Sequence, residues 1–264
     1  MWRASGTWSH TLEASYVDTE DLALAAAGVT LRRRTGGPDE GWHLKRPTVD
    51  GARVETRVPL GAADGPVPEE LVTYVRALVR DRPLVRVATM LNQREVHALL
   101  DAEGAELAEV CDDRVRGTAL VGPRAADGDG ELLWREWEVE LGGGEPDLLD
   151  AAAALLGEAG AAPASSESKL QRVLGTEPTA SSSGLGPDQA GAVLWNHVAA
   201  QVAELKARDP EVRTDEPDGV HKMPVASRRA AERLADVRSV ARPERHRTAA
   251  RRAQGPRRRP RPGR

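Results

Sequence analysis

The sequence contains no phenylalanine and only one cysteine among its 264 residues. A single cysteine, Cys111, excludes an internal disulfide framework and a zinc site built on several cysteines. No apolar run approaches the roughly 20 residues that a membrane-spanning helix needs, and residues 1–15 do not read as a signal peptide. We therefore expect a cytoplasmic protein that has no membrane partner. Its core must be built mainly from Ala, Val and Leu.

The charges are nearly balanced in number but unevenly distributed, with 37 Lys and Arg against 41 Asp and Glu. Residues 242–264 hold ten arginines and one glutamate, which leaves 27 basic and 40 acidic residues in the rest of the chain. This tail has almost nothing to bury, so we predict that it is disordered. Two interpretations stay open: decayed or out-of-frame coding sequence, or a basic arm that binds polyphosphate or nucleic acid without sequence preference.

Short alternating segments separated by turn residues predict strands through residue 141, and segments with helical spacing predict the helices. The predicted strands are 29–34, 42–46, 53–58, 84–99, 105–120 and 132–141. The predicted helices are 67–81, 146–159, 188–208 and 217–238. Residues 175–187 are rich in Ser, Gly and Pro, which is typical of a linker. We divide the chain into a domain at 1–174, this linker, a helical segment at 188–241 and the tail.

Charged side chains are segregated by sign along the predicted strands. Side chains at i, i+2 and i+4 share one face of a strand, so Arg32 and Arg34 lie together on an early strand. Glu136, Glu138 and Glu140 lie together on the last one. Three neighbouring carboxylates repel one another unless a cation neutralises them, and Mg²⁺ or Mn²⁺ prefers carboxylate oxygens. An alternative is a sheet with one solvated face, but such a face usually mixes the two signs.

Several segments resemble the CYTH domain of the triphosphate tunnel metalloenzymes, in the order that this family has them. The resemblance covers about residues 13–174. Its segments are Tyr16-Val-Asp18-Thr19, Leu31-Arg32-Arg33-Arg34-Thr-Gly-Gly, Trp42-His-Leu-Lys45, Arg53-Val-Glu55, Leu107-Ala-Glu109 with Asp112-Asp113, the Glu136/Glu138/Glu140 strand and Ser168-Lys169-Leu.

The resemblance implies an α+β fold, an antiparallel β-barrel whose tunnel binds a triphosphate with one or two divalent metal ions. It implies catalytic roles for Glu109, Glu138 and Lys169. It also implies a metal site and a phosphate-binding set. The implied metal ligands are Asp113, Glu136, Glu138 and Glu140, and the implied phosphate ligands are Arg32, Arg34, Lys45, Arg57 and Arg94.

One family feature has no counterpart in this sequence. The family opens with a strand that carries Glu-x-Glu-x-Lys, and residues 1–15 contain no such pattern. We therefore expect a barrel that lacks its first strand and has two unpaired edges. Catalysis would then be impaired, unless the true start lies further upstream.

The segment after the linker resembles the beginning of a CHAD domain, a histidine-containing helical domain that binds polyphosphate. The resemblance rests on residues 194–205 and on Asp218-Gly-Val-His221-Lys222-Met223. It implies that His221, Arg228 and Arg229 bind polyphosphate from one helix face. The domain is truncated, because the tail replaces the further helices that the family has.

Three functions follow as hypotheses. The first is metal-dependent hydrolysis of inorganic triphosphate or short polyphosphate. The second is polyphosphate binding without catalysis. The third is an activity like that of an adenylate cyclase or a thiamine triphosphatase. The oligomeric state is left open.

Overall fold

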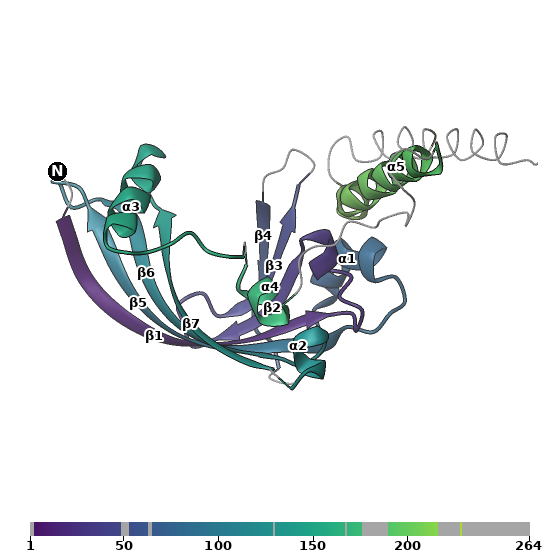
Figure 1. Ribbon diagram of the computed structural model, residues 1–264, viewed down its shortest axis with the longest axis horizontal. Coiled ribbons are helices and arrows are strands. Elements are labelled where there is room, and N and C mark those ends of the chain that lie inside the picture. Colours follow the sequence, from purple (N-terminus) through teal and green to yellow (C-terminus); the bar gives the residue numbers. More distant parts are fainter. Residues whose placement is uncertain are drawn as a thin grey trace, which may run out of the picture.

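The computed structural model describes residues 3–48, 53–62, 65–128, 130–166, 168–175, 190–215 and 228. One curved antiparallel sheet dominates it, with the strand order β4-β3-β2-β1-β5-β6-β7 (Figure 1). The strands are β1 (Arg3–Asp18), β2 (Thr30–Thr35), β3 (Gly41–Pro47), β4 (Arg53–Val58), β5 (Val85–Leu100), β6 (Glu106–Ala119) and β7 (Glu131–Leu141).

The predicted fold class, an α+β chain with an antiparallel sheet and flanking helices, is confirmed. The sheet curls but does not close into a barrel. Within the described ranges, β4 and β7 each pair on one side only, so they form the two expected edges.

The central strand of the sheet, β1, was not predicted. It pairs with β5 along its whole length and with β2 through Glu13–Val17, whereas the first predicted strand begins at residue 29. Its residues are mostly small and polar, which makes a weak strand signal, and Gly6 sits at a register shift with a positive φ of 79°. Pairing with β5 along the whole strand, and with β2 near its C-terminal end, overrides that weak local preference.

The β2–β4 meander packs against a helix through one of its faces. Helix α1 (Glu69–Val79) buries Leu71, Val75 and Val79 against Leu31 of β2 and Leu44 of β3. Because side chains alternate along a strand, the residues on either side of Leu31 in β2 and of Leu44 in β3 point to the opposite face. The predicted meander and helix are therefore confirmed, and the helix leaves the charged face of the meander uncovered.

A second helix covers the opposite, concave face of the sheet (Figure 1). Helix α4 (Lys169–Leu174) is six residues long and buries Leu170, Val173 and Leu174 in a cluster with residues of β1, β5 and β6. Its N-cap, Ser168, accepts a hydrogen bond from the backbone N–H of Gln171 at 3.2 Å. Helix α4 thus stands on the sheet with its N-terminus fixed in place.

The remaining helices lie at the periphery. They are a 3₁₀ turn, η1 (Ala25–Ala27), α2 (Pro123–Ala126), α3 (Asp147–Glu158) and α5 (Ala190–Arg213). Helix α3 buries none of its residues, and α5 packs on α1. Two apolar residues of α5 are exposed, Val193 at 63% and Val202 at 39%.

Several predicted segments cannot be compared with the structure. The linker, the helix at 217–238 and the tail lie outside the described residues, except for Gly175 and Arg228. No helix in the described ranges is long and apolar enough to span a membrane.

The contact between α4 and β6 depends on a glycine and yields a prediction. A Cβ atom at Gly117 would lie 2.2 Å from Cγ2 of Val173 and 3.2 Å from the Trp134 ring. We expect Gly117→Ala to lower the free energy of unfolding by about 1–3 kcal/mol, because the core has no room for the methyl group. Urea unfolding measures this.

Gly157→Ala is the matched control, because Gly157 lies in the exposed helix α3 and a Cβ there meets nothing within 4 Å. It should leave the stability unchanged or raise it slightly. Equal losses for the two variants would contradict the packing argument.

Candidate functional site

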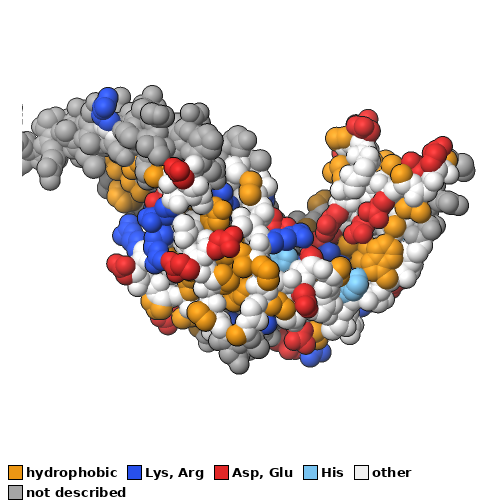
Figure 2. Space-filling model, turned by 180° about the vertical axis from the view of Figure 1, so that it is seen from behind, with side chains coloured by type: hydrophobic (Ala, Val, Ile, Leu, Met, Phe, Trp, Pro, Cys, Tyr) orange, Lys and Arg blue, Asp and Glu red, His pale blue; other side chains and the backbone are white. Residues whose placement is uncertain are grey.

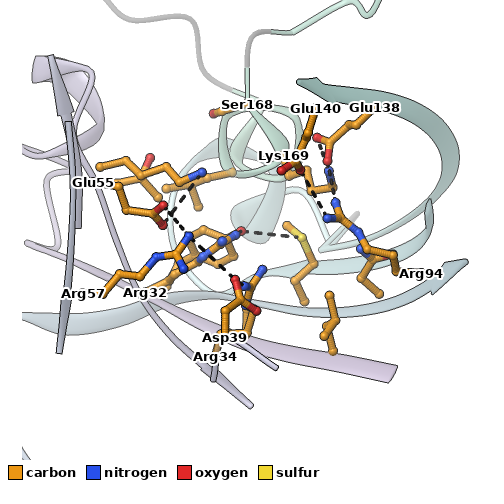
Figure 3. A pocket seen from close by; sticks show the side chains of 18 of the residues that line it. Arg32, Arg34, Asp39, Glu55, Arg57, Arg94, Glu138, Glu140, Ser168 and Lys169 are labelled. Atoms are coloured by element: carbon orange, nitrogen blue, oxygen red, sulfur yellow. Dashed lines mark hydrogen bonds and ion pairs between the residues drawn. The ribbon is translucent and has the colours of Figure 1, made fainter. Parts of the chain in front are cut away.

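A cavity of about 240 Å³ lies between the concave face of the sheet and α4 (Figure 3). The surface is hollowed between the end of the sheet beside α3 and the part of the molecule that contains α1 and α5 (Figure 2). Acidic and basic side chains meet at the base of this hollow. The cavity lining includes seven cationic side chains and four acidic ones. They are Arg32, Arg34, Lys45, Arg53, Arg57, Arg94 and Lys169, with Asp39, Glu55, Glu138 and Glu140.

One wall of the cavity is cationic and comes from β2, β3 and β4. Strand alternation places Arg32 and Arg34 of β2 on the face away from α1, beside Lys45 of β3 and Arg57 of β4. The structure therefore brings together four of the five predicted phosphate ligands on one wall. Arg32 forms no ion pair with any residue in the described part of the chain; its Nη1 donates a hydrogen bond to the Tyr16 hydroxyl, at 3.5 Å.

The opposite wall carries an acidic cluster from β6 and β7. Asp113 pairs in register with Glu136, and Glu138 follows on the same face of β7. One carboxylate oxygen from each of these three residues lies within 4.8 Å of the other two. Asp113 is fully buried, whereas the Glu138 side chain is 39% exposed and lines the cavity.

Two cations lie inside this acidic cluster. Arg94 of β5 binds Asp113 through two hydrogen bonds, from Nε and Nη2, each 2.7 Å long. Nζ of Lys169 lies 2.5 Å from Glu136, 2.5 Å from Glu138 and 3.0 Å from Asp113. Glu140 lies at the rim, with its carboxylate 3.4 Å from Nη1 of Arg94. Thus Arg94, predicted to bind phosphate, lines the cavity and pairs there with the carboxylates.

The pKa shifts of this cluster follow from its charge pairs. Burial alone would lower the pKa of Lys169, but Glu138, Asp113 and Glu136 outweigh it and raise that pKa. Burial alone would raise the pKa of Asp113, but Arg94 and Lys169 lower it. The charge pairs of Asp113 with Arg94 and Lys169 therefore favour the ionised forms of Asp113 and Lys169.

The cationic wall contains a buried histidine that was not predicted as a site residue. Nδ1 of His43 lies 2.8 Å from Glu55, and its Nε2 lies 2.8 Å from the backbone oxygen of Asp39. Glu55 in turn binds Arg57 at 2.9 Å, and the Asp39 carboxylate pairs with Arg34. His43 thus fixes both acidic residues that hold the arginines of this wall. His43 shares a face of β3 with Lys45, so strand alternation could have placed it in this wall but could not have shown that it is buried.

The other predicted site residues are placed less centrally. Glu109 of β6 pairs in register with Glu140 but does not line the cavity, and burial, together with Glu106 and Glu140, raises its pKa. His221 and Arg229 lie outside the described residues, and Arg228 is exposed. The roles proposed for these four residues remain predictions.

The donor set of the acidic cluster fits a hard divalent cation. Three carboxylates converge from two adjacent strands, and one of them, Asp113, is held rigidly by Arg94. Carboxylate oxygens are the ligands that Mg²⁺ and Mn²⁺ prefer. Asp113, Glu136 and Glu138 are therefore the residues that could hold a metal, at the edge of a cavity whose far wall is cationic.

The comparisons with known proteins agree with this arrangement. Residues 2–174 match the CYTH domain family. Two uncharacterized proteins of Mycobacterium tuberculosis, from strains CDC 1551 and H37Rv, are each 43% identical over 234 residues, which is 85% of this chain and 45% of theirs. This chain therefore spans less than half the length of those relatives.

A solved structure, a putative adenylate cyclase from Bacillus halodurans, has 19% sequence identity and a TM-score of 0.41. The match covers 62% of this chain and 82% of that one. A likeness this weak carries no argument about activity.

The charge network of the cationic wall yields a prediction about pH. Burial would raise the pKa of Glu55, but hydrogen bonds from Arg57 and His43 lower it from 4.5 to about 2. The stabilisation by Glu55 is therefore complete above pH 4.5 and lost as the pH falls toward 2. We expect Glu55→Gln to cost about 1–3 kcal/mol of unfolding free energy at pH 7. This deficit should shrink by at least about half at pH 3.

Urea unfolding of both proteins between pH 7 and pH 3 measures the effect. Glu70→Gln, which changes an exposed glutamate of α1, is the control and should show no such trend. A deficit for Glu55→Gln that stays constant with pH would refute the proposed charge pairing.

Proposed function

Because this chain belongs to the CYTH family, we propose that it hydrolyses inorganic triphosphate or short polyphosphate in a reaction that needs Mg²⁺ or Mn²⁺. One observation carries the proposal: a single cavity has a cationic wall on β2–β4 and, facing it, an acidic cluster that fits a divalent metal. Phosphoryl transfer needs these two elements, cations that bind phosphate oxygens and carboxylates that bind a metal.

The residues of the cationic wall would bind and orient the substrate. Arg32 is the first candidate, because its guanidinium has no carboxylate partner among the described residues and offers a planar fork that matches phosphate oxygens. Arg34, Lys45 and Arg57 each have an acidic partner within 4.0 Å, so phosphate would share them with Asp39 and Glu55.

The acidic wall would supply the metal site and position the attacking water. When bound, the metal would polarise phosphate oxygens and offset their charge. Glu138 is the partly exposed member of the cluster and borders the cavity, so its carboxylate can accept a hydrogen bond from water beside the terminal phosphoryl group.

Polyphosphate binding without catalysis is the second candidate. Arg94 and Lys169 already neutralise the carboxylates that would hold a metal, and this observation favours it. In that case the cationic wall would still hold a polyanion, but no phosphate would be released.

The part of the chain beyond residue 174 would add a second polyanion site. The relatives match over 234 residues, more than the CYTH match alone contains, so their similarity reaches past the tunnel domain. We propose that α5 begins a CHAD-like helical domain in which His221, Arg228 and Arg229 bind polyphosphate. The same proposal includes residues 175–187 as a linker and residues 242–264 as a basic tail. It also includes a cytoplasmic location for the protein.

A phosphate-release assay distinguishes the two candidates. With inorganic triphosphate and Mg²⁺ or Mn²⁺, the protein should release phosphate, and Glu138→Gln should reduce the rate at least about 100-fold, which is typical for the loss of a general base or an electrostatic group. Glu131→Gln is the matched control, because Glu131 lies on the same strand but on its opposite face.

Binding of triphosphate without turnover, unchanged by Glu138→Gln, would support the binding protein and refute the hydrolase. The same assay is repeated with ATP as the substrate. Formation of cyclic AMP from ATP without release of phosphate from triphosphate would assign a cyclase instead.

A further inference from the structure

We propose that Lys169 is an exchangeable cation, which occupies the acidic cluster when no metal is bound and moves to the substrate phosphates when a metal binds. The inference rests on the proposed metal-dependent function and deepens it. Through this exchange, a single side chain would link the binding of the metal to the binding of the triphosphate.

The position of the ammonium group is the first observation. Nζ of Lys169 contacts Asp113, Glu136 and Glu138, the same three residues whose oxygens lie within 4.8 Å of one another. An ammonium group has three N–H donors, and here three carboxylates lie within 3.0 Å of Nζ. The lysine therefore occupies the place where these oxygens would surround a metal ion.

A metal ion and this ammonium group exclude one another. A divalent ion bound by the three carboxylates would take the lone pairs that now accept from Nζ. It would also place two like-charged centres only a few ångströms apart. Metal binding must therefore push Nζ out of the cluster.

Arg94 and Lys169 are held in the cluster in different ways, and this difference indicates which of them moves. Arg94 is fixed by its planar two-bond contact with the fully buried Asp113. Lys169 binds through a point charge on a flexible four-carbon chain. Its backbone lies at the first residue of α4, which the buried Leu170, Val173 and Leu174 hold on the sheet. The ammonium group can therefore change partners while the helix stays in place.

The cavity gives the displaced ammonium group a destination. Lys169 lines the cavity together with Arg32 of the opposite wall (Figure 3). A triphosphate bound there would offer oxygens to Nζ. Metal binding would thus release a phosphate ligand, and bound triphosphate would in turn make the acidic cluster easier for a metal to enter, because such coupling is reciprocal.

Metal binding without substrate tests the competition directly. Mn²⁺ is titrated into the full chain and free Mn²⁺ is read by electron paramagnetic resonance. Lys169→Met removes the competing charge, so we expect the affinity for Mn²⁺ to rise roughly 10-fold or more, within the 5- to 150-fold range of ordinary coupling free energies. Lys169→Arg keeps the charge and should bind Mn²⁺ no more tightly than the parent protein.

Arg172→Met is the matched control for a general loss of positive charge. Arg172 lies on the same helix, 3.9 Å from Glu136, and stacks on Trp134 instead of entering the cluster. It should change the Mn²⁺ affinity less than about 3-fold, since a distant, partly exposed pair is weakly coupled. Equal gains for Lys169→Met and Arg172→Met would overturn the exchange.

A second measurement uses the parent protein and does not depend on how the variants fold. The lysines are acetylated briefly with and without Mg²⁺, and the modified sites are quantified by mass spectrometry. In the absence of metal, Nζ of Lys169 is held by three carboxylates and its side chain is only 13% exposed. We expect Mg²⁺ to increase its labelling several-fold, whereas labelling of Lys206 on α5 stays constant.

The outcomes separate this inference from the proposed function. Tighter Mn²⁺ binding by Lys169→Met together with metal-dependent labelling supports the exchange, even if no triphosphate is hydrolysed. Hydrolysis by a protein whose Lys169 labelling and Mn²⁺ affinity do not respond in this way refutes the exchange and leaves the hydrolase. A protein in which neither the parent nor Lys169→Met binds Mn²⁺ refutes the exchange as well.

Discussion

The neutralisation of Asp113, Glu136 and Glu138 is the interaction on which the site depends. Three ionised carboxylates on adjacent strands cannot be gathered at one edge of a cavity without positive charge between them. Arg94 supplies one positive charge from β5 and Lys169 supplies a second from α4, against the three carboxylates. The pairing of β5, β6 and β7 and the apolar contact of α4 with the sheet serve to hold these groups in register.

The two walls of the cavity are built on the same principle with opposite signs. The acidic wall carries Arg94 and Lys169 within it, and the cationic wall carries Asp39 and Glu55, which the buried His43 holds in position. Each wall thus contains ion pairs that offset part of its charge before any ligand enters. A polyanion and a metal ion would therefore bind by exchanging partners with these internal ion pairs.

Alternation along the strands allowed much of this arrangement to be predicted. It placed Arg32 and Arg34 together, and Glu136 with Glu138, because period-two spacing fixes the face of a side chain once a segment is a strand. It could not place Lys169 among the carboxylates, since the partner of a long side chain depends on contacts between distant segments. It also missed β1, whose small polar residues are held in the sheet by pairing with β5 rather than by their own strand preference.

The packing of α4 explains how the ammonium group of Lys169 can change partners while its helix stays in place. The helix is short, and three buried apolar residues fix it on a surface that Gly117 leaves flat enough for close contact. The first residue of α4, Lys169, places its flexible side chain among the charged groups of the cluster. This side chain can change its conformation while the helix stays folded. Arginine in its place would form a planar, two-bond contact such as the one Arg94 makes, and would exchange less readily. A rigid helix that carries one flexible cation is therefore suited to a site whose partners must change during binding.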